Sequence, residues 1–326
     1  MYKVTVIGGG TGSFSMLTGL RNYPDVDLAA IVTMTDDGGS SGILRDELGV
    51  LPPGDVRQCL VALADAKDLW RRLFAYRFSQ GSLAGQNFGN LFISALEKIT
   101  GSFENALDAA GEMLQVKGRV IPVTLDDVRL IAETTDGRTI RGEHQIDLKE
   151  AGIKRIYFEP EPSANPAAVR RILESDAVVI GPGDIYTSIL PNILVQGIKT
   201  ALRDTNGVKV YVCNIMTQRA HTHGLTVKGF VDLLERQVDS TLFDVVVYNE
   251  KMPNPSFLES YAREGEFPVK GEESEHKGSK VRYKGYDLLS EKVPQQVPGD
   301  KIMRALIRHD PLKAASAVYN ICKEGK

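Results

Sequence analysis

Short apolar runs alternate along the chain with amphipathic segments, and this alternation predicts the fold. The runs have the length of buried strands, and the stretches between them show the spacing of helices. The expected strands are 4–7, 28–32, 177–180, 208–213 and 243–248, and the expected helices are 55–65, 88–99, 166–174, 190–203 and 225–238. Such alternation is typical of an α/β protein with a mostly parallel sheet and helices on both faces.

Two segments depart from this rhythm. Residues 119–158 contain three strand-like stretches with a strong hairpin signal at Asp136-Gly137, which predicts a small antiparallel β insertion. Residues 250–300 are rich in Pro, Gly, Glu and Lys and predict a solvated excursion. Asp310 and Pro311 then begin a last helix as its N-cap and first residue. We expect a single α/β domain over residues 1–326 that carries both segments.

Composition narrows the class of protein. Of the 326 residues, 42% are hydrophobic and 25% are charged, which is enough to bury a full core. The formal net charge of -3 gives no global attraction for nucleic acid or for an anionic membrane. No apolar run approaches the ~20 residues that cross a bilayer, and Cys59, Cys213 and Cys322 fit neither a disulfide framework nor a zinc site. We therefore expect a cytoplasmic protein that neither binds nucleic acid nor inserts into a membrane.

The loops that follow the strands carry the candidate chemistry. If the strands are parallel, the loops after Ile7, Val32, Ile180, Cys213 and Tyr248 all lie at the carboxyl edge of one sheet. Open α/β folds bind their ligands at that edge. Three of the loops, GGGTG, TDDGGSSG and GPGDIYTS, are rich in glycine or hydroxyl residues. This convergence predicts a Rossmann-like fold with a ligand site at the carboxyl edge.

The first loop predicts a phosphate site. Unobstructed backbone N–H groups at a helix N-terminus suit an anionic oxygen, and the candidates are Gly8, Gly9, Gly10, Thr11 and Gly12. The pattern resembles the dinucleotide fingerprint, but Ser13 stands where the third glycine belongs. No Gly-Lys-Ser/Thr follows to make a P-loop. The alternative is a tight turn that only lets the helix pack.

The second loop adds two adjacent acids, Asp36 and Asp37. One acid would suffice to hold ribose hydroxyls in a nicotinamide-binding protein, whereas two can share a divalent cation that bridges a diphosphate. Arg45 is either a charge partner or a solvated helix residue. The alternative is an ordinary Asp-Gly turn with a serine cap. The surrounding candidate donors to phosphate or sugar are Gly38, Gly39, Ser40 and Ser41.

Two later segments have an ordinary structural interpretation. In PPGDVRQC, Asp55 is expected to cap the following helix, with Gln58 completing a capping box. In GQNFGN, Asn87 is expected to cap the next helix, whereas capping leaves the polar Asn90 unexplained. Asn87 and Asn90 are therefore also candidate ligand-binding residues.

The GPGDIYTSILPN loop repeats the theme of the first loop. Its amides and hydroxyls predict a second anion or sugar site at Gly181, Gly183, Asp184, Tyr186 and Thr187. A turn before a helix that starts at Pro191 would explain the glycines but not the hydroxyls. The H-x-H pair at positions 221 and 223 has no third ligand in the sequence, so we expect a surface pair rather than a metal site.

The chain resembles the 2-phospho-L-lactate transferase (CofD-like) superfamily, in its gluconeogenesis-factor (YvcK-like) branch. The resemblance covers residue 1 to about 220 and is weaker beyond. It rests on seven motifs in register: GGGTG, TDDGGSSGILRDEL, LPPGDVRQCLVAL, GQNFGNLF, RVIPVTLDDVRL, GPGDIYTSILPN and CNIMTQ.

The two branches of this superfamily imply different functions. The transferase branch implies an enzyme that moves a phospholactyl group from a GDP-activated donor to a deazaflavin alcohol with magnesium, releasing GMP. The factor branch implies a cytoplasmic regulator that binds UDP-sugars such as UDP-N-acetylglucosamine. It supports growth on gluconeogenic carbon sources, cell shape and peptidoglycan synthesis, and no accepted catalytic activity comes with it. LPPGDVRQCLVAL and VIPVTLDDVRL look more like the factor branch.

Three hypotheses follow: a nucleotide-sugar-binding regulator, a transferase, and an NAD(P)-binding protein. The last ranks lowest, because the third glycine is missing and no His or Lys is placed for hydride chemistry. The resemblance implies magnesium at Asp36 and Asp37, and these acids with Asp55 are the catalytic candidates if a reaction occurs. Binding itself is expected to need no cofactor. A homodimer and cell-wall regulatory protein partners are also implied.

Three positions depart from the superfamily pattern. Asp184 stands where a serine is usual, Gln86-Asn87 where His-Ser or His-Asn is common, and RAHTHG follows Met-Thr-Gln where an acidic stretch is common. An aspartate at position 184 would repel phosphate unless it faces a sugar or a metal.

Overall fold

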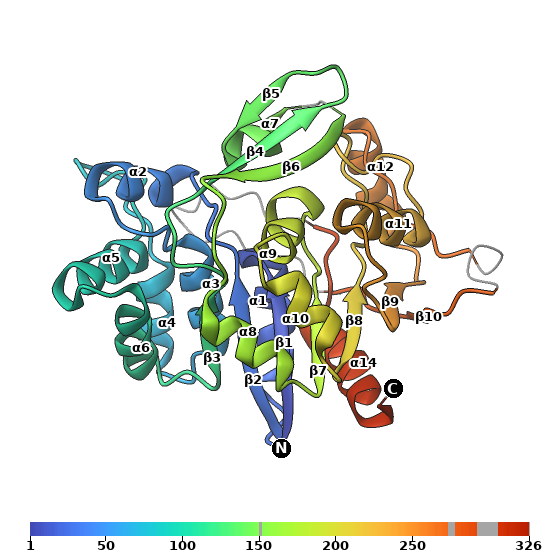
Figure 1. Cartoon of the computed structure of the whole chain (residues 1–326), viewed down its shortest axis with the longest axis horizontal. Coiled ribbons are helices and arrows are strands. Elements are labelled where there is room, and N and C mark those ends of the chain that lie inside the picture. The colour runs from blue at the N-terminus through green and yellow to red at the C-terminus, as the bar shows by residue number, and fades with distance from the viewer. Residues whose placement is uncertain (150–151, 273–277, 292–305, 326) are drawn as a thin grey trace.

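A seven-stranded sheet forms the centre of the protein (Figure 1). The computed structural model describes residues 1–149, 152–272, 278–291 and 306–325. The strand order is β10-β9-β8-β7-β1-β2-β3, and every neighbouring pair is parallel, as the sequence predicts. The strands are β1 (Tyr2–Gly8), β2 (Val26–Val32), β3 (Arg119–Pro122), β7 (Ala177–Ile180), β8 (Val208–Val212), β9 (Val245–Asn249) and β10 (Arg282–Tyr286).

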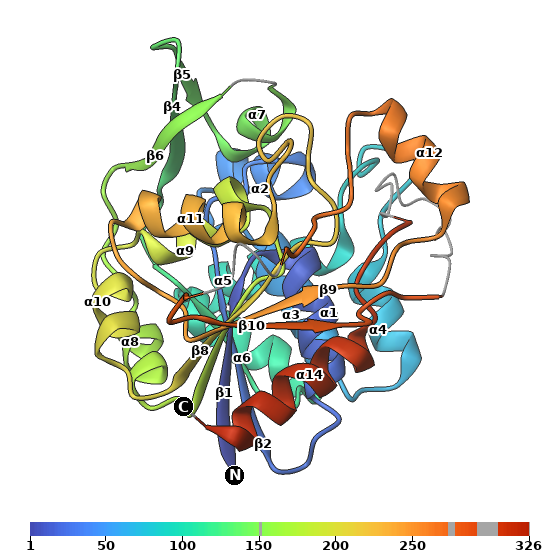
Figure 2. The same ribbon diagram turned by 90° about the vertical axis from the view of Figure 1, so that its right-hand side faces the viewer.

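Helices cover both faces of this sheet, which explains why its central strands are buried along most of their length rather than at alternate residues. Every residue of β7 is buried. Figure 2 shows α1, α3 and α14 on one side of the sheet and α8 and α10 on the other. The helices on the first side and around β3 are α1 (Gly10–Leu20), α2 (Gly39–Leu48), α3 (Gly54–Leu63), α4 (Asp68–Ala75), α5 (Phe88–Thr100), α6 (Phe103–Leu114) and α14 (Pro311–Glu324). The others in the main body are α8 (Pro166–Leu173), α9 (Leu190–Ile193), α10 (Ile198–Asp204), α11 (Val227–Val238) and α12 (Pro255–Arg263).

The strand register brings the loops to one edge. Gly8 at the end of β1 lies opposite Val32 at the end of β2, and Ile7 lies opposite Ile180 at the end of β7. The loops after these strands therefore leave the sheet side by side. This confirms the expected convergence at the carboxyl edge. Within the described residues, no helix has the length and apolar character that a membrane crossing requires.

The antiparallel insertion is smaller than the sequence predicts. It consists of β4 (Arg129–Thr134), β5 (Thr139–Arg141) and β6 (Ile153–Glu159), with α7 (Glu143–Leu148) between β5 and β6. The 119–122 stretch was expected in this insertion, but it is β3, the parallel edge strand of the main sheet next to β2. A four-residue edge strand has too few residues for its pattern to reveal its partner. Figure 1 shows the insertion above the carboxyl edge of the main sheet.

The expected excursion at 250–300 is only partly an excursion. It includes α12 and the edge strand β10, which pairs in parallel with β9. The β10 sequence RYKGY is polar and has no buried residue, so it gives no hydrophobic signal. Residues 273–277 and 292–300 of this prediction lie outside the described residues.

The helix expected at 190–203 is interrupted. The chain forms a five-residue π-helix, η1 (Ile185–Ile189), continues as α9, and restarts as α10 after Gly197. Gly197 has a φ of 99°, a backbone conformation that ends a helix and that glycine adopts without strain. The two pieces share the burial expected of one helix, which is why periodicity alone does not separate them.

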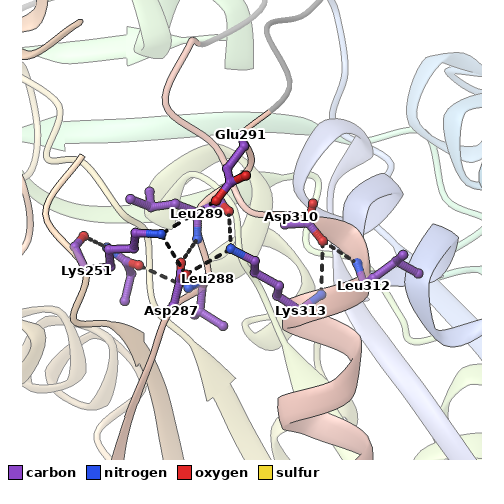
Figure 3. Close-up of polar contacts among 9 residues, drawn as sticks. Lys251, Asp287, Leu288, Leu289, Glu291, Asp310, Leu312 and Lys313 are labelled. Carbon is purple, nitrogen blue, oxygen red and sulfur yellow. Dashed lines mark hydrogen bonds and ion pairs between the residues drawn. The ribbon is translucent and has the colours of Figure 1, made fainter. Parts of the chain in front are cut away.

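A polar cluster fixes the last helix to the edge of the sheet (Figure 3). The Asp287 carboxylate, just after β10, binds the ammonium groups of Lys251 and Lys313, each at 2.9 Å. Asp310 caps α14 as predicted, accepting hydrogen bonds from the amides of Leu312 and Lys313 at 2.9 and 3.1 Å. The hydrogen bond from Lys251 and the other contacts lower the pKa of Asp287 to about 2.

We predict that Asp287→Asn lowers the free energy of unfolding by about 1 kcal/mol, because one carboxylate holds two ammonium groups at a partly exposed site. The pKa of Asp287 is lowered by folding, so its contribution exists above the unfolded pKa and is lost as pH falls toward 2. Chemical denaturation at pH 7 and pH 3 measures this difference. Asp204→Asn is the control, since Asp204 forms an exposed ion pair with its neighbour Arg203. Equal losses in both variants would contradict the prediction.

Candidate functional site

The glycine loop is pressed against two other segments. A Cβ on Gly12 would overlap the carbonyl oxygen of Pro182, and one on Gly9 would lie 2.6 Å from Ser188 Oγ. Both contacts join the β1–α1 loop to the loop after β7. The tight-turn interpretation therefore accounts for Gly12, whereas the exposed Thr11 is free to face a ligand at the start of α1.

Ser13, at the place of a third fingerprint glycine, is buried beneath the loop, where its Oγ would lie 2.6 Å from a Cβ on Gly8. The Gly8 carbonyl accepts a hydrogen bond from Asn192 Nδ2 at 3.1 Å. Gly8 and Ser13 thus belong to the packing under the loop. Gly9 and Gly10 are buried as well, so the open part of the loop is the exposed Thr11 and the half-buried Gly12.

The predicted capping box at Asp55 and Gln58 is wrong. Pro53 is the N-cap of α3, two residues earlier than the predicted cap at Asp55, so Asp55 lies inside the first turn. Its carboxylate instead accepts a hydrogen bond from the Gly10 amide, and Gln58 Nε2 approaches Asp55 Oδ1 at 3.5 Å. Gln58 Oε1 accepts a long hydrogen bond of 3.4 Å from Thr11 Oγ1. Helix α3 therefore supplies polar side chains to the glycine loop.

A chain of hydrogen bonds anchors the second loop. Asp36 accepts hydrogen bonds from the Gly38 amide at 3.0 Å and from the Ser41 hydroxyl. Asn90 Nδ2 donates to Ser41 Oγ at 3.3 Å, and Arg57 Nε donates to Asn90 Oδ1 at 2.8 Å. Asn90 thus connects α3 to the second loop. Arg57, which the sequence analysis did not select, is the basic end of this chain.

The hydroxyl of Ser40 connects the same loop to the start of α5. Ser40 Oγ donates to Gln86 Oε1 at 2.8 Å and accepts a hydrogen bond from the Asn87 amide at 3.1 Å. Asn87 caps α5 as predicted, accepting a hydrogen bond from the Asn90 amide at 3.1 Å. Gly38 is the N-cap of α2 and has no side chain to cap it. The amides of the first turn of α2, from Gly39 on, therefore lie at this edge without a side-chain cap.

Arg45 does not join the site. It is 3% exposed, donates from Nε to Asp127 Oδ1 at 2.7 Å, and also contacts the Val128 carbonyl. Its position six residues into α2 turns it toward the β3–β4 connection. The structure therefore gives Arg45 a packing and pairing role.

The unusual aspartate of the third loop, Asp184, has a structural role. Asp184 Oδ1 accepts hydrogen bonds from the amides of Tyr186 and Thr187 at 2.8 and 2.9 Å, so Asp184 caps η1. The Gly183 amide donates to Asn214 Oδ1, in the loop after β8, at 3.2 Å. Gly181 has a φ of 77°, and the peptide bond between Gly181 and Pro182 is cis. The loops after β7 and β8 are therefore joined at the carboxyl edge.

Aromatic side chains border this third loop. Tyr186 is buried, and its ring meets that of His221 edge to face with centroids 5.4 Å apart. Burial, followed by the charge of Asp184, raises the pKa of Tyr186 to about 12, so its hydroxyl stays protonated at neutral pH. His223 lies edge to face with Phe267, at 5.7 Å. The two histidines thus contact different aromatic rings.

Helix α7 of the insertion adds two acids that the sequence analysis missed. Glu143 accepts a hydrogen bond from the Thr35 hydroxyl, and Asp147 accepts one from Thr187. The His144 amide donates to Asp37 Oδ1 at 2.9 Å. No motif marks EHQIDL as part of a site, because only the fold of the insertion brings α7 down to the carboxyl edge.

The carboxyl groups of this site are short of cationic partners. Burial, and then the charge of Asp36, raises the pKa of Asp55 to about 7, and burial raises the pKa of Glu143 well above its usual range. Burial also raises the pKa of Asp36, while Arg57 is the basic group that opposes this rise. Asp36 turns toward α3 and Asp37 toward α7. Within the described residues, no three His, Cys, Asp or Glu side chains are grouped to hold a metal ion.

This is the arrangement of a Rossmann-like α/β protein. Glycine loops lie at the carboxyl edge of a parallel sheet, and two helices begin there at glycine N-caps. The chain belongs to the CofD family, because the family model described as 2-phospho-L-lactate transferase CofD matches residues 4–289. A crystal structure of a UPF0052-family protein from Bacillus halodurans is similar with a TM-score of 0.90 and 35% identity, and the match covers 98% of each chain.

Two similar proteins carry related names. A protein named gluconeogenesis factor from Bacillus subtilis is 37% identical over 324 residues, which are 99% of this chain and 98% of that protein. A Nostoc protein, provisionally named a gluconeogenesis factor, is 47% identical over 270 residues, which are 82% of this chain. The match spans 59% of the Nostoc protein's length. The chain is thus similar to gluconeogenesis factors.

We predict that Gly12→Ala lowers the free energy of unfolding by about 3 kcal/mol, because two backbones must separate to admit a methyl group. Gly38→Ala is the matched control. Its Cβ would have 3.5 Å to its nearest neighbour, and its φ of -89° suits alanine, so a change within about 0.5 kcal/mol is expected. Urea denaturation of the two variants measures both values. A Gly12→Ala protein as stable as Gly38→Ala would refute the close approach.

We predict that the ligand-free protein loses stability as pH rises from about 4 to about 7. The pKa of Asp55 is raised by folding, so the unfolded chain releases this proton at lower pH than the folded chain does. The loss from Asp55 is about 4 kcal/mol, because a pKa that differs by one between the folded and unfolded states is worth about 1.4 kcal/mol, and it is complete about one pH unit above 7. Thermal denaturation between pH 4.5 and pH 8 measures it. Asp55→Asn should flatten the profile, and an unchanged slope in that variant would contradict the assignment.

Proposed function

We propose that this protein is a regulatory factor that binds a nucleotide sugar, such as UDP-N-acetylglucosamine, at the carboxyl edge of its sheet. The observation that carries the proposal is the junction of three strand-end loops. The β1–α1 loop touches the loop after β7 at Ser188 and Pro182, and α3 connects it to Asp36 on the loop after β2. A diphosphate suits this junction, because helices α1 and α2 both begin there at glycine N-caps.

Each part of the ligand has a candidate partner. The diphosphate is proposed to contact the amides of Thr11 and Gly12 and those from Gly39 to Ser41. The Gly10 amide already donates to Asp55, and the Gly38 amide to Asp36. The sugar or base is proposed to lie toward the third loop, where Thr187 and the protonated hydroxyl of Tyr186 are hydrogen-bonding groups beside the glycines. The similarity to proteins named gluconeogenesis factor supports a role in growth on gluconeogenic carbon sources. Cell shape and peptidoglycan synthesis are proposed as the processes served.

The crowding of carboxyl groups sets a condition on this binding. A diphosphate brings negative charge to a site where Asp36, Asp55 and Glu143 already share a small volume. Either protons on these acids or a cation must offset the repulsion. We propose that magnesium, held by Asp36 or Asp37 together with the diphosphate, does so at neutral pH. Binding without magnesium is then expected to weaken as pH rises through 7.

Calorimetric titration tests the ligand class. UDP-N-acetylglucosamine, UDP-glucose, GDP and NAD are each titrated with and without magnesium at pH 6 and pH 8. The proposal expects a UDP-sugar to bind with a micromolar dissociation constant and to outcompete GDP and NAD. A dissociation constant weaker than about 1 mM for every UDP-sugar would rule out this function. Preferential binding of NAD would favour the NAD(P)-binding alternative instead.

We predict that Thr11→Glu weakens binding of the nucleotide sugar by at least about tenfold, which is 1.4 kcal/mol. A carboxylate in the first turn of α1 repels the diphosphate but interacts favourably with the helix dipole, so the fold is kept. Thr11→Gln is the matched control, because it adds the same bulk without charge. Calorimetry measures affinity, and thermal denaturation confirms folding. Equal affinities in the two variants would place the diphosphate elsewhere.

The family model favours a transferase as the second candidate function. In this case Asp36, Asp37 and Asp55 would hold magnesium and position the attacking hydroxyl of a deazaflavin alcohol. The protein is incubated with the deazaflavin alcohol, the GDP-activated phospholactyl donor and magnesium, and released GMP is measured. GMP release that depends on the alcohol would establish an enzyme. Its absence, beside tight binding of a UDP-sugar, would establish the regulator.

A cytoplasmic location, a homodimer and protein partners in cell-wall regulation belong to the same proposal. Sedimentation analysis with and without UDP-N-acetylglucosamine tests the dimer. A single monomer mass under both conditions would remove the homodimer from the proposal and leave the ligand assignment untouched.

A further inference from the structure

Helix α4 and its C-cap carry apolar side chains that the fold covers only in part. Leu69 and Leu73 recur at helical spacing on α4, and Tyr76 follows as the C-cap. Leu69 and Tyr76 are 71% and 47% exposed, Leu73 is half-buried, and the Tyr76 ring meets that of Phe78 edge to face. Trp70, beside them, is 38% exposed. The buried anchor of α4 is Phe74, which packs against the rings of Phe88 and Phe92. Figure 2 shows α4 on the outside of the molecule, beyond α1 and α3.

The same segment is positively charged. Residues 67–87 contain four basic side chains and one acid, Asp68, in a chain whose net charge is -3. Arg72 approaches Asp68 at 4.0 Å, but both side chains are more than three-quarters exposed, so this pair contributes little. The Nε atom of Arg71 is buried with no hydrogen-bond partner among the described residues. The positive charge of this segment is therefore not neutralised within it.

We propose that the α4 face, made of Leu69, Trp70, Arg72, Leu73 and Tyr76, docks an acidic amphipathic segment of a partner protein. Tryptophan, tyrosine and arginine are the residues that contribute most to binding at protein interfaces. The apolar stripe matches one face of an amphipathic helix, and the uncompensated charge selects acidic residues on its flanks. The positive charge of this face thus favours an acidic segment over a basic one.

The α4 face is joined to the candidate ligand site. The Tyr76 carbonyl accepts a hydrogen bond from the Phe88 amide at 2.9 Å, and the Phe78 amide donates to the Gln86 carbonyl at 2.9 Å. Gln86 in turn accepts the hydrogen bond from Ser40. A partner on this face therefore contacts the segment that positions the second loop. Docking itself does not depend on the function proposed above.

The single tryptophan of the chain, Trp70, reports on this face directly. The probe is a synthetic helical peptide of about 18 residues, five turns, with leucine on one face and glutamate on the rest. We expect a saturable blue shift of Trp70 fluorescence that weakens at high salt. Leu69→Asp and Arg72→Glu should each weaken binding by about tenfold. Arg203→Glu, at an exposed arginine on α10, is the matched control and should leave it unchanged.

Four outcomes would overturn the proposal. The first is equal binding of a peptide with lysine in place of glutamate, and the second is no saturable shift at about 1 mM acidic peptide. The third is a stronger Trp70 shift with vesicles of phosphatidylglycerol than with the peptide, which would indicate a membrane surface. The fourth is a shift that develops with protein concentration alone, which would indicate a second copy of this chain.

Photocrosslinking in cells that express the protein tests the natural partner. A photoreactive residue replaces Leu69, and mass spectrometry maps the segment to which it becomes attached. An acidic, amphipathic segment of another protein supports the proposal even if the synthetic peptide is a poor mimic. A basic segment, a lipid or a second copy of this chain overturns it.

Discussion

The close approach of two backbone loops, at Gly12 and Pro182, is the contact on which the rest of the site depends. It exists because β1 and β7 are neighbours in register, so that the chain leaves both strands at the same level. A side chain at Gly12 would separate the loops and with them the helices that follow. The N-terminus of α1 is thereby fixed against the loop that leads into η1. An anion site made of backbone amides needs such rigidity, because amides bind well only when already oriented.

Around this contact the protein gathers carboxyl groups in excess of basic ones. Asp55 comes from α3, Asp36 from the loop after β2 and Glu143 from the insertion. Each loses hydration on burial, which raises its pKa. The chain of hydrogen bonds from Arg57 through Asn90 to Ser41 fixes the geometry but offsets little of the charge. Under the proposed function, binding of a diphosphate is therefore linked to protons or cations. The insertion takes part in this linkage, since α7 contacts the loops after β2 and β7 at once.

Sequence reasoning located the loops better than it assigned their side chains. The first and third loops touch, and the second reaches the first through α3, because their strands are parallel and neighbouring. Of the two expectations for Arg45, pairing with a charge holds, but its partner is Asp127. Asp55 does not cap α3 and instead accepts a hydrogen bond from Gly10. A shift of the helix start to Pro53 decided the second case. Local patterns do not fix a cap to within one or two residues, and two residues rotate a side chain by about 200° around a helix.

The sequence by itself determined the parallel sheet, the turns after its strands and the caps at Asn87 and Asp310, because these depend on local spacing and local hydrogen bonds. Only the tertiary structure decided that β3 and β10 complete the main sheet, since polar or very short edge strands carry no periodic signal. It also decided that Glu143 and Asp147 reach the site. Their placement depends on how an antiparallel insertion folds back over a distant edge, and such long-range contacts leave no pattern along the chain.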